Sequence, residues 1–328
     1  MDERVPAEFV GSLPRWDCGC LHIGFGMVTL AWLHSCDQLD EAWTCCGTIM
    51  DMVICYLSQS PNAFIGIQNA YSWGYCSYNG YWTVPNELVP IHLLPTICST
   101  EKIVGLVKQA NFGLPIGAKL LASCGDLQST VYPLLEPGIA VLNLGTSAQL
   151  CFLPTVNQMV FSPFLTKPFF DESGKKKIIV IASMNGGNAI NLIAEKIVEW
   201  ASKLVSGTND LQIDYEKLSN ILNETGKCSS STINVQPVFL PERADNISSC
   251  ITGINSSTTV EELLHCTACG IISNLFRLFP PYQLRKWGIE CIKLAGNASR
   301  NYFIDEIIRQ CQGLLEISSS SDEYSKCS

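Results

Sequence analysis

The feature that most restricts the fold of this chain is a turn of three small residues, Gly145-Thr146-Ser147, set between two apolar runs. The first run covers residues 139–144 and the second covers residues 148–152. Two short apolar segments joined by a small turn predict a β-hairpin. Gly and hydroxyl residues at the tip of such a turn can point backbone N–H groups at a phosphate. The same residues are also ordinary turn formers, so the turn alone does not establish a phosphate site.

An isolated Gly125-Asp126 pair precedes this hairpin. A carboxylate near a phosphate site can accept the proton of an attacking hydroxyl, so the pair and the turn together indicate phosphoryl transfer. Asp is also a preferred N-cap residue, and residues 128–135 have the pattern of a short helix. Asp126 is therefore predicted as a general base or as a helix cap, and one residue can fill both roles.

From residue 113 onwards, predicted strands alternate with predicted helices, which is typical of an α/β fold. The strands are expected at 118–123, 139–144, 148–152, 177–184, 235–240 and 289–294. The helices are expected at 128–135, 188–204, 215–222 and 258–279, with a last helix that reaches Gln310.

The first hundred residues have a different pattern, with helical spacing at 24–33 and 47–57. Residues 62–95 are rich in aromatics, Gly, Asn and Pro, which predicts ordered loops and short strands with the aromatic rings in the core. The change of pattern predicts a domain at 1–112 and another at 113–317, followed by a Ser-rich disordered tail at 318–328.

Composition narrows the class of protein further. The chain has 328 residues and a formal net charge of −9, which suits two domains and argues against a nucleic-acid partner. No apolar run is long enough to span a membrane, and the charged start lacks the apolar stretch of a signal peptide, so a cytoplasmic location is expected. The 17 cysteines then indicate reduced thiols, and no histidines are paired for zinc.

An acidic chain that binds a nucleotide needs a cation, so Mg²⁺ is expected.

Taken together, these segments resemble the FGGY carbohydrate kinases. The stretch Gly125-Asp126-Leu127-Gln128-Ser129-Thr130-Val131-Tyr132 resembles the catalytic-aspartate segment of that family, and residues 142–150 resemble its second phosphate motif. Shorter matches follow the family's order at residues 68–75, 185–188, 242–243 and 299–301. The resemblance implies an actin-like, ribonuclease-H-like ATPase fold with two domains flanking a cleft. Residues 1–112 would be a remnant of the sugar-side domain and residues 113–317 a nearly complete nucleotide-side domain.

The resemblance also implies a reaction, which is transfer of the γ-phosphoryl group of ATP to a ketose hydroxyl, with sedoheptulose as the sugar. Asp126 would be the catalytic base, and Mg²⁺ would arrive with ATP rather than on direct protein ligands. The partners would be a sugar and a nucleotide, with no nucleic acid and no membrane, and homo-oligomer formation is left open. The implied ATP-binding residues are Gly145, Thr146, Ser147, Gly186, Gly187, Gly296, Asn297 and Asn301. The implied substrate-binding residues are Asp2, Arg4, Asn69, Ser72 and Gln128.

The chain also departs from the family pattern. Asp2 and Arg4 resemble the end of a Trp-x-Asp-x-Arg motif whose Trp would precede Met1, so the first strands and the first phosphate loop are expected to be missing. A strand-helix unit is expected to be missing at the other end. Ala295 and Pro241 stand where the family usually has Gly. These departures keep an alternative open, a catalytically inactive kinase fragment that binds a nucleotide or a partner protein.

Overall fold

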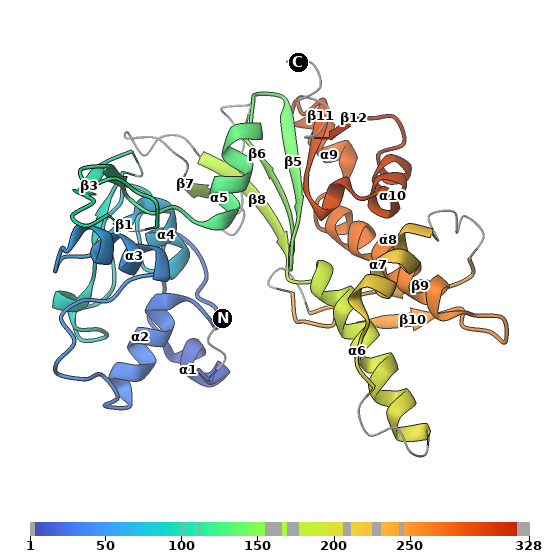
Figure 1. Ribbon diagram of the computed structural model, residues 1–328, viewed down its shortest axis with the longest axis horizontal. Helices are drawn as coiled ribbons and strands as arrows, with labels where there is room; N and C mark the ends of the chain where they lie inside the picture. The colour runs from blue at the N-terminus through green and yellow to red at the C-terminus, as the bar shows by residue number, and fades with distance from the viewer. Residues whose placement is uncertain are drawn as a thin grey trace. The chain divides into compact units, whose positions relative to one another are not determined.

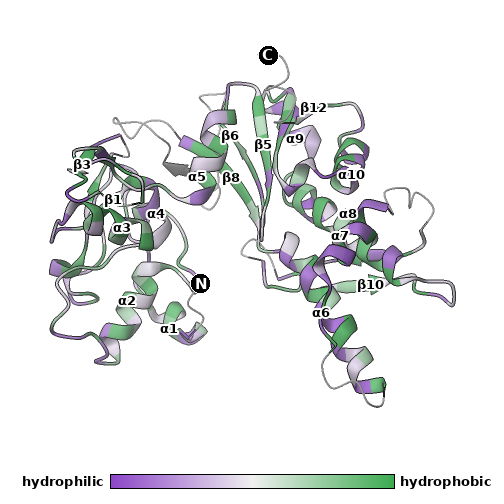
Figure 2. Ribbon diagram, in the orientation of Figure 1, coloured by the Kyte–Doolittle hydropathy of each residue, from purple (hydrophilic) through white to green (hydrophobic). Residues whose placement is uncertain are grey.

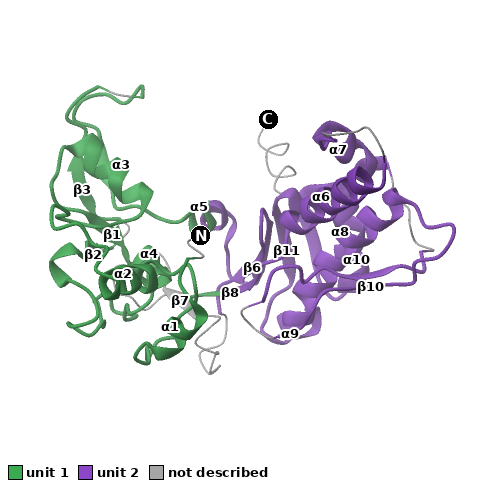
Figure 3. Cartoon of the chain, turned by 90° about the horizontal axis from the view of Figure 1, so that it is seen from below, with its two compact units in different colours: residues 1–129, 160–179 green, residues 130–159, 180–328 purple. Residues whose placement is uncertain are grey.

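The chain forms two compact units, which Figure 3 colours separately. The structure is a computed structural model that describes residues 4–99, 101–110, 112–154, 166–168, 177–205, 211–224, 231–242 and 246–319. Unit 1 comprises residues 1–129 and 160–179, and unit 2 comprises residues 130–159 and 180–328. The chain thus changes unit after Ser129, further along than the domain border predicted at 112, which stays a prediction.

A six-stranded sheet, in the order β12-β11-β5-β6-β8-β7, carries the predicted hairpin (Figure 1). β5 (Ile139–Leu144) and β6 (Ala148–Phe152) are antiparallel and have the bounds that the sequence predicts. β11 (Cys291–Gly296) runs parallel to β5 on its other side. Consecutive residues of β5 are buried although their side chains point to opposite faces, so both faces are covered, and β5 has hydrophobic colouring along much of its length in Figure 2. The other strands beyond β6 are β8 (Lys177–Ser183) and β7 (Thr166–Pro168).

The last described strand corrects a prediction about the end of the chain. β12 (Glu316–Ser319) pairs in parallel with β11, with Ile317 opposite Ile292. The sequence predicts no strand there and a disordered tail from residue 318, which is wrong for Ser318 and Ser319. Backbone hydrogen bonds to β11 hold this strand at the end of the sheet, so a largely polar sequence suffices. Residues 320–328 lie outside the described residues.

The helix α8 (Val260–Leu278) is the buried helix of unit 2. The sequence predicts this helix at 258–279 with Thr258 or Thr259 as its N-cap, and the structure selects Thr259, whose hydroxyl accepts a hydrogen bond from the backbone N–H of Glu262. It packs against α6 (Gly187–Leu204) and α10 (Asn301–Cys311). The strand predicted at 235–240 ends at Gln236, because Pro237 has no N–H to donate to a ladder. The remaining elements of unit 2 are η2 (Tyr132–Leu134), α7 (Tyr215–Glu224), β9 (Asn234–Gln236), β10 (Cys250–Thr252), α9 (Pro281–Lys286) and η3 (Asn297–Ser299).

The core of unit 1 is aromatic, as predicted, and includes Trp16, Tyr71 and Tyr75. Tyr71 lies on α4 (Ile67–Trp73), a helix inside the segment that the sequence predicts as loops and short strands. The apolar spacing of Ile67, Ala70 and Tyr71 is helical and accounts for the correction. The other elements are α1 (Ala7–Ser12), α2 (Gly26–Ser35), α3 (Ile49–Ser58), η1 (Ile91–Leu93), the parallel pair β1 (Phe64–Gly66) and β2 (Thr96–Cys98), the antiparallel pair β3 (Ile103–Leu106) and β4 (Lys119–Leu121), and α5 (Asp126–Val131), which continues into unit 2.

Candidate functional site

The hairpin turn of unit 2, residues 145–147, is fixed by backbone hydrogen bonds. The N–H of Gly145 donates to the carbonyl of Ser147 at 3.0 Å across the turn. The loop between β8 and α6 bonds the turn from the other side. The N–H of Gly187 donates to the carbonyl of Gly145 at 2.9 Å, and the N–H of Asn188 donates to that of Thr146 at 3.2 Å. The turn and the first residues of α6 therefore form one rigid corner.

Gly186 makes this close approach possible. A Cβ at position 186 would lie 2.4 Å from the carbonyl carbon of Ser147 and 2.8 Å from the backbone nitrogen of Ala148. Any side chain there would push the loop and the turn apart. Gly296, at the end of β11, has a φ of +61°, and a Cβ there would lie 2.7 Å from the carbonyl oxygen of Leu144. Two of the predicted nucleotide-site glycines therefore act by bringing backbone segments together.

A pocket of about 320 Å³ opens beside this corner, entirely within unit 2. Four of the predicted ATP-binding residues line it, namely Gly145, Thr146, Gly187 and Asn297. The first turn of α6 lines the pocket, and the helix dipole places a partial positive charge there that favours an anion, while the N–H groups of Gly187 and Asn188 are used within the corner. Phosphate oxygens are the kind of ligand that this end of the pocket suits.

The other four predicted ATP-binding residues do not line the pocket. Gly186 and Gly296 support it as described above. The Ser147 hydroxyl accepts a hydrogen bond from the side-chain amide of Gln149, which keeps it within the hairpin. Asn301 is the exposed first residue of α10.

The sequence did not predict the residues that form the rest of the pocket wall. Two helices, α7 and α10, supply most of this wall. Tyr302 on α10 is sufficiently buried for desolvation to raise the pKa of its phenol. The sequence signals were the spacing of Leu218 and Leu222, which marks one apolar face of α7, and the short family matches that contain Asn188 and Arg300. The lining residues not predicted are Asn188, Ile190, Asn191, Tyr215, Leu218, Ser219, Leu222, Arg300, Tyr302 and Phe303.

In unit 1, the predicted catalytic residue Asp126 is the first residue of α5 and is exposed. Its Oδ1 accepts a hydrogen bond from the N–H of Leu127 at 2.8 Å, which is more local than a standard N-cap bond to the second or third helical residue. The Ser129 N–H and hydroxyl both donate to the carbonyl of Gly125 at 3.0 Å. The Gly125 backbone is thus tied down while the Asp126 carboxylate faces outwards.

Two predicted substrate-binding residues lie next to Gly125 and are buried. A Cβ at position 125 would lie 2.5 Å from Gln128 Oε1 and 3.2 Å from Asn69 Oδ1. The Asn69 amide donates to Ser123 Oγ at 3.0 Å, and Ser123 donates to the carboxylate of Asp51, which is 0% exposed. Asp51 also accepts hydrogen bonds from the Thr48 N–H and hydroxyl, at 2.7 and 2.8 Å. Sequence reasoning missed Asp51.

The remaining predicted substrate residues are less informative. Ser72 lies on α4 and is partly exposed. The guanidinium of Arg4 lies over the Trp32 ring at 5.7 Å, a cation–π contact. Asp2 lies outside the described residues, as does Arg243 of the short match at 242–243.

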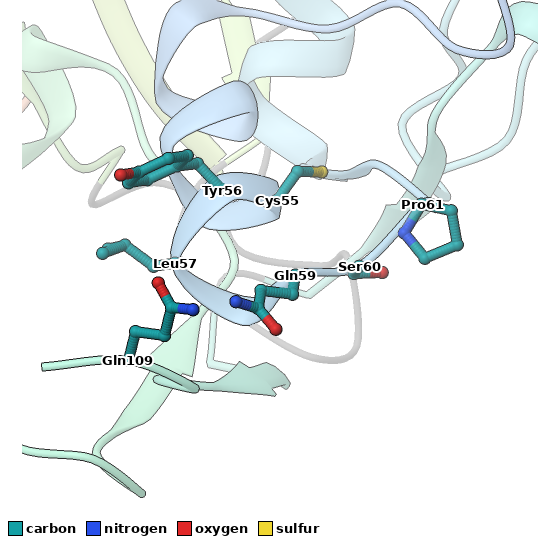
Figure 4. A pocket seen from close by; sticks show the side chains of 7 residues that line it. All are labelled: Cys55, Tyr56, Leu57, Gln59, Ser60, Pro61 and Gln109. Carbon is teal, nitrogen blue, oxygen red and sulfur yellow. The ribbon is translucent and has the colours of Figure 1, made fainter.

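A second hollow, of about 450 Å³, lies in unit 1 and is shown in Figure 4. It contains none of the predicted site residues. Its lining has no charged side chain, so it does not suit a phosphate: Cys55, Tyr56, Leu57, Gln59, Ser60, Pro61 and Gln109. Among the residues that the structure describes, no group of three or more His, Cys, Asp or Glu side chains is placed to hold a metal ion. Within the same ranges, no helix has the length and apolar character needed to cross a membrane.

The chain has clear relatives among known proteins. Sedoheptulokinases of Mus musculus and Homo sapiens are each 29% identical to it, over 94% of this chain and 66% of their own length. The chain thus spans just under two thirds of the length of these relatives. No protein-family model matches it.

Solved sugar-kinase structures have the same fold. Plasmodium falciparum glycerol kinase with ADP superposes with a TM-score of 0.67 at 17% identity, covering 94% of this chain and 62% of that one. Xylulose kinase from Rhodospirillum rubrum gives 0.64 at 14% identity, with coverages of 97% and 66%. The chain thus has the α/β, actin-like ATPase fold of these sugar kinases. In sequence, it is similar to the two sedoheptulokinases.

Proposed function

We propose that this protein acts as an ATP-dependent carbohydrate kinase whose acceptor is a ketose, with sedoheptulose converted to sedoheptulose 7-phosphate. The observation that carries the proposal is the corner formed by the hairpin turn and the start of α6, beside a pocket that suits a nucleotide. The sedoheptulokinase relatives support the choice of sugar, which rests on 29% identity.

In this proposal the nucleotide lies in the pocket of unit 2. The turn residues Gly145, Thr146 and Ser147 hold the β- and γ-phosphate oxygens through the backbone N–H groups of Thr146 and Ser147, and the dipole of α6 adds a partial positive charge. Asn297 and Asn301 lie near the adenosine, and Tyr302 and Phe303 provide an apolar surface for it. When bound with ATP, Mg²⁺ would neutralise charge on the phosphates.

Asp126 is the proposed general base. Its exposed carboxylate accepts the proton of the sugar hydroxyl while the hydroxyl oxygen bonds to the γ-phosphorus. The bond from that phosphorus to the β–γ bridging oxygen breaks, and ADP leaves. Asn69 and Gln128, adjacent to Gly125, are proposed to orient the sugar. General-base help of this kind is worth about 10²–10⁴-fold, and positioning and charge stabilisation supply most of the remaining rate.

The alternative is a lobe that binds nucleotide, or a partner, without turnover. The observation in its favour is that every lining residue of the nucleotide pocket belongs to unit 2, whereas Asp126 belongs to unit 1. Nucleotide binding could therefore persist without the chemistry.

The decisive experiment combines a phosphorylation assay with nucleotide binding. Sedoheptulose, xylulose and glycerol are compared as acceptors in ATP-dependent ADP release, and sedoheptulose is expected to react fastest. The Asp126→Ala variant is expected to lose about 10²–10⁴-fold in kcat and to bind ADP as the unchanged protein does. Glu87→Gln removes a negative charge from an exposed position of the same unit and serves as the control. An active Asp126→Ala variant would remove this residue from the mechanism, and nucleotide binding without turnover in the unchanged chain would favour the alternative.

A further inference from the structure

A buried carboxylate, Glu242, lies against the loop that joins β8 to α6. Only 7% of Glu242 is exposed, although it follows a segment with no helix or strand. Its Oε1 accepts hydrogen bonds from Ser183 Oγ at 2.6 Å, and from the side-chain amides of Asn185 and Asn274 at 2.9 Å each. Its Oε2 accepts a bond from the backbone N–H of Met184 at 2.9 Å. One carboxylate thus binds the last residue of β8, the next two residues of the loop and one residue of α8.

Further hydrogen bonds make this cluster continuous. The Asn185 amide donates to the carbonyl of Leu240 at 2.8 Å, and its Oδ1 accepts from the Leu240 N–H at 2.8 Å. The Asn274 amide also donates to Ser183 Oγ at 3.1 Å, and Arg277 Nη2 donates to Asn274 Oδ1 at 2.9 Å. The β8–α6 loop, the segment before Glu242 and α8 therefore share one network inside unit 2.

The chemistry of the donors explains why a carboxylate stands at position 242. All four are uncharged N–H or O–H groups that point at the same two oxygens. An ionised carboxylate only accepts hydrogen bonds, so it satisfies all of them at once. A Gln side chain would turn an NH₂ group towards donors on one side and leave at least one of them unsatisfied.

The loop that Glu242 holds is the one that builds the candidate nucleotide pocket. The next residues after Asn185 are Gly186, which has no room to move towards Ser147, and Gly187, which donates to Gly145. A shift of the loop backbone would therefore be transmitted to the hairpin turn and to the first turn of α6.

We propose that Glu242 is a positioning residue for the nucleotide pocket, because its carboxylate fixes residues 183–185, at the end of β8 and the start of the loop, and through them the corner formed by Gly145 and Gly187. The inference rests on the proposed function only for the identity of the ligand, a nucleoside di- or triphosphate. The loop geometry itself can be tested without any ligand.

The test compares Glu242→Gln with Glu306→Gln. Glu306 is a buried carboxylate of α10 in the same unit, and it accepts hydrogen bonds from Ser273, Arg309 and Gln310, none of which belongs to the loop. Glu242→Gln is expected to weaken ADP binding about tenfold, while Glu306→Gln changes it less than about twofold. Both variants are expected to lower the melting temperature, so a structural role alone would not separate them.

Hydrogen exchange of the ligand-free protein gives the second readout. Peptides covering residues 183–188 and 144–148 are expected to exchange faster in Glu242→Gln than in Glu306→Gln. If Glu242→Gln is too unstable to study, Ser183→Ala removes one donor and is expected to show the same pattern more weakly. Unchanged exchange in these peptides, or ADP binding equal to that of the control, would overturn the inference. If the unchanged protein binds no nucleotide, the proposed function fails, whereas faster exchange would still support the positioning role.

Discussion

The two units each hold a segment of candidate site residues with a buried carboxylate, but they do so in different ways. In unit 1, Asp51 belongs to α3 and caps its own helix through Thr48 while it accepts a hydrogen bond from Ser123. In unit 2, Glu242 belongs to no helix or strand and bonds the β8–α6 loop directly. Asp51 therefore stabilises its own helix and also positions candidate site residues, whereas Glu242 mainly fixes the loop.

The surroundings of the two carboxylates differ as well. The corner in unit 2 is closed by backbone hydrogen bonds and a glycine contact, and the Glu242 carboxylate supports it from the loop behind. The segment in unit 1 depends on a relay of side chains from Asp51 through Ser123 to Asn69. We expect the nucleotide corner to be most sensitive to a change in backbone spacing, and the acceptor segment to be most sensitive to a change in one polar side chain.

The largest effect is expected from Gly186→Ala. Its Cβ would lie 2.4 Å from the carbonyl carbon of Ser147, which is backbone and cannot rotate away. Overpacking of this kind costs about 1–3 kcal/mol or more, and we expect ADP affinity to fall by at least about tenfold in a calorimetric titration. The matched control is Gly11→Ala, since nothing lies within 4 Å of a Cβ at that position. Normal ADP binding by Gly186→Ala would show that the corner is not built by backbone contact.

A smaller and differently distributed effect is expected from Asp51→Asn. The amide cannot accept from Thr48 and Ser123 as the carboxylate does, and an unsatisfied buried partner costs about 1–3 kcal/mol. We expect a lower melting temperature and about a tenfold lower kcat, with ADP affinity unchanged within about twofold. Asp17→Asn, at an exposed position of the same unit, is the control. Equal losses of nucleotide affinity in Asp51→Asn and Glu242→Gln would remove the distinction between the two carboxylates.

The smallest effect concerns the pH dependence of stability in unit 2. Burial lowers the pKa of His265 on α8, against the opposing effect of Glu306 and Asp305. The unfolded chain then takes up a proton before the folded one does, so stability falls as the pH drops below the ordinary pKa of histidine. We expect His265→Gln to reduce the loss of melting temperature between pH 7 and pH 5, while the exposed His92→Gln leaves it unchanged. Identical pH profiles for all three proteins would contradict this assignment.

How much of this could be predicted from sequence depended on the range of the interactions. The β5–β6 hairpin was predicted with its bounds because its apolar runs and small turn are local signals. β12 was missed because its residues are polar and its strand conformation comes from pairing with β11. The helix α4 was missed because aromatic and polar residues obscured its apolar spacing.

The site divides in the same way. The turn residues, the glycines and Asp126 belong to short motifs that can be recognised in the sequence. The pocket walls from α7 and α10 come together only in the tertiary structure. The partners of the two carboxylates are also distant in sequence, since Ser123 follows Asp51 by 72 residues and Glu242 follows Ser183 by 59. No local pattern could have joined them.

The loop held by Glu242 also sets the direction of the long helix that follows it. Gly187 begins α6, an 18-residue helix that at 1.5 Å per residue is about 27 Å long. If the first turn of α6 rotated by a few degrees, the C-terminal end of the helix would move by about 1–2 Å, because a helix of this length moves as a rigid body. Trp200 stands near that end with 56% of its surface exposed. A change in the fluorescence of Trp200 would therefore report a change in the orientation of α6 relative to the nucleotide corner.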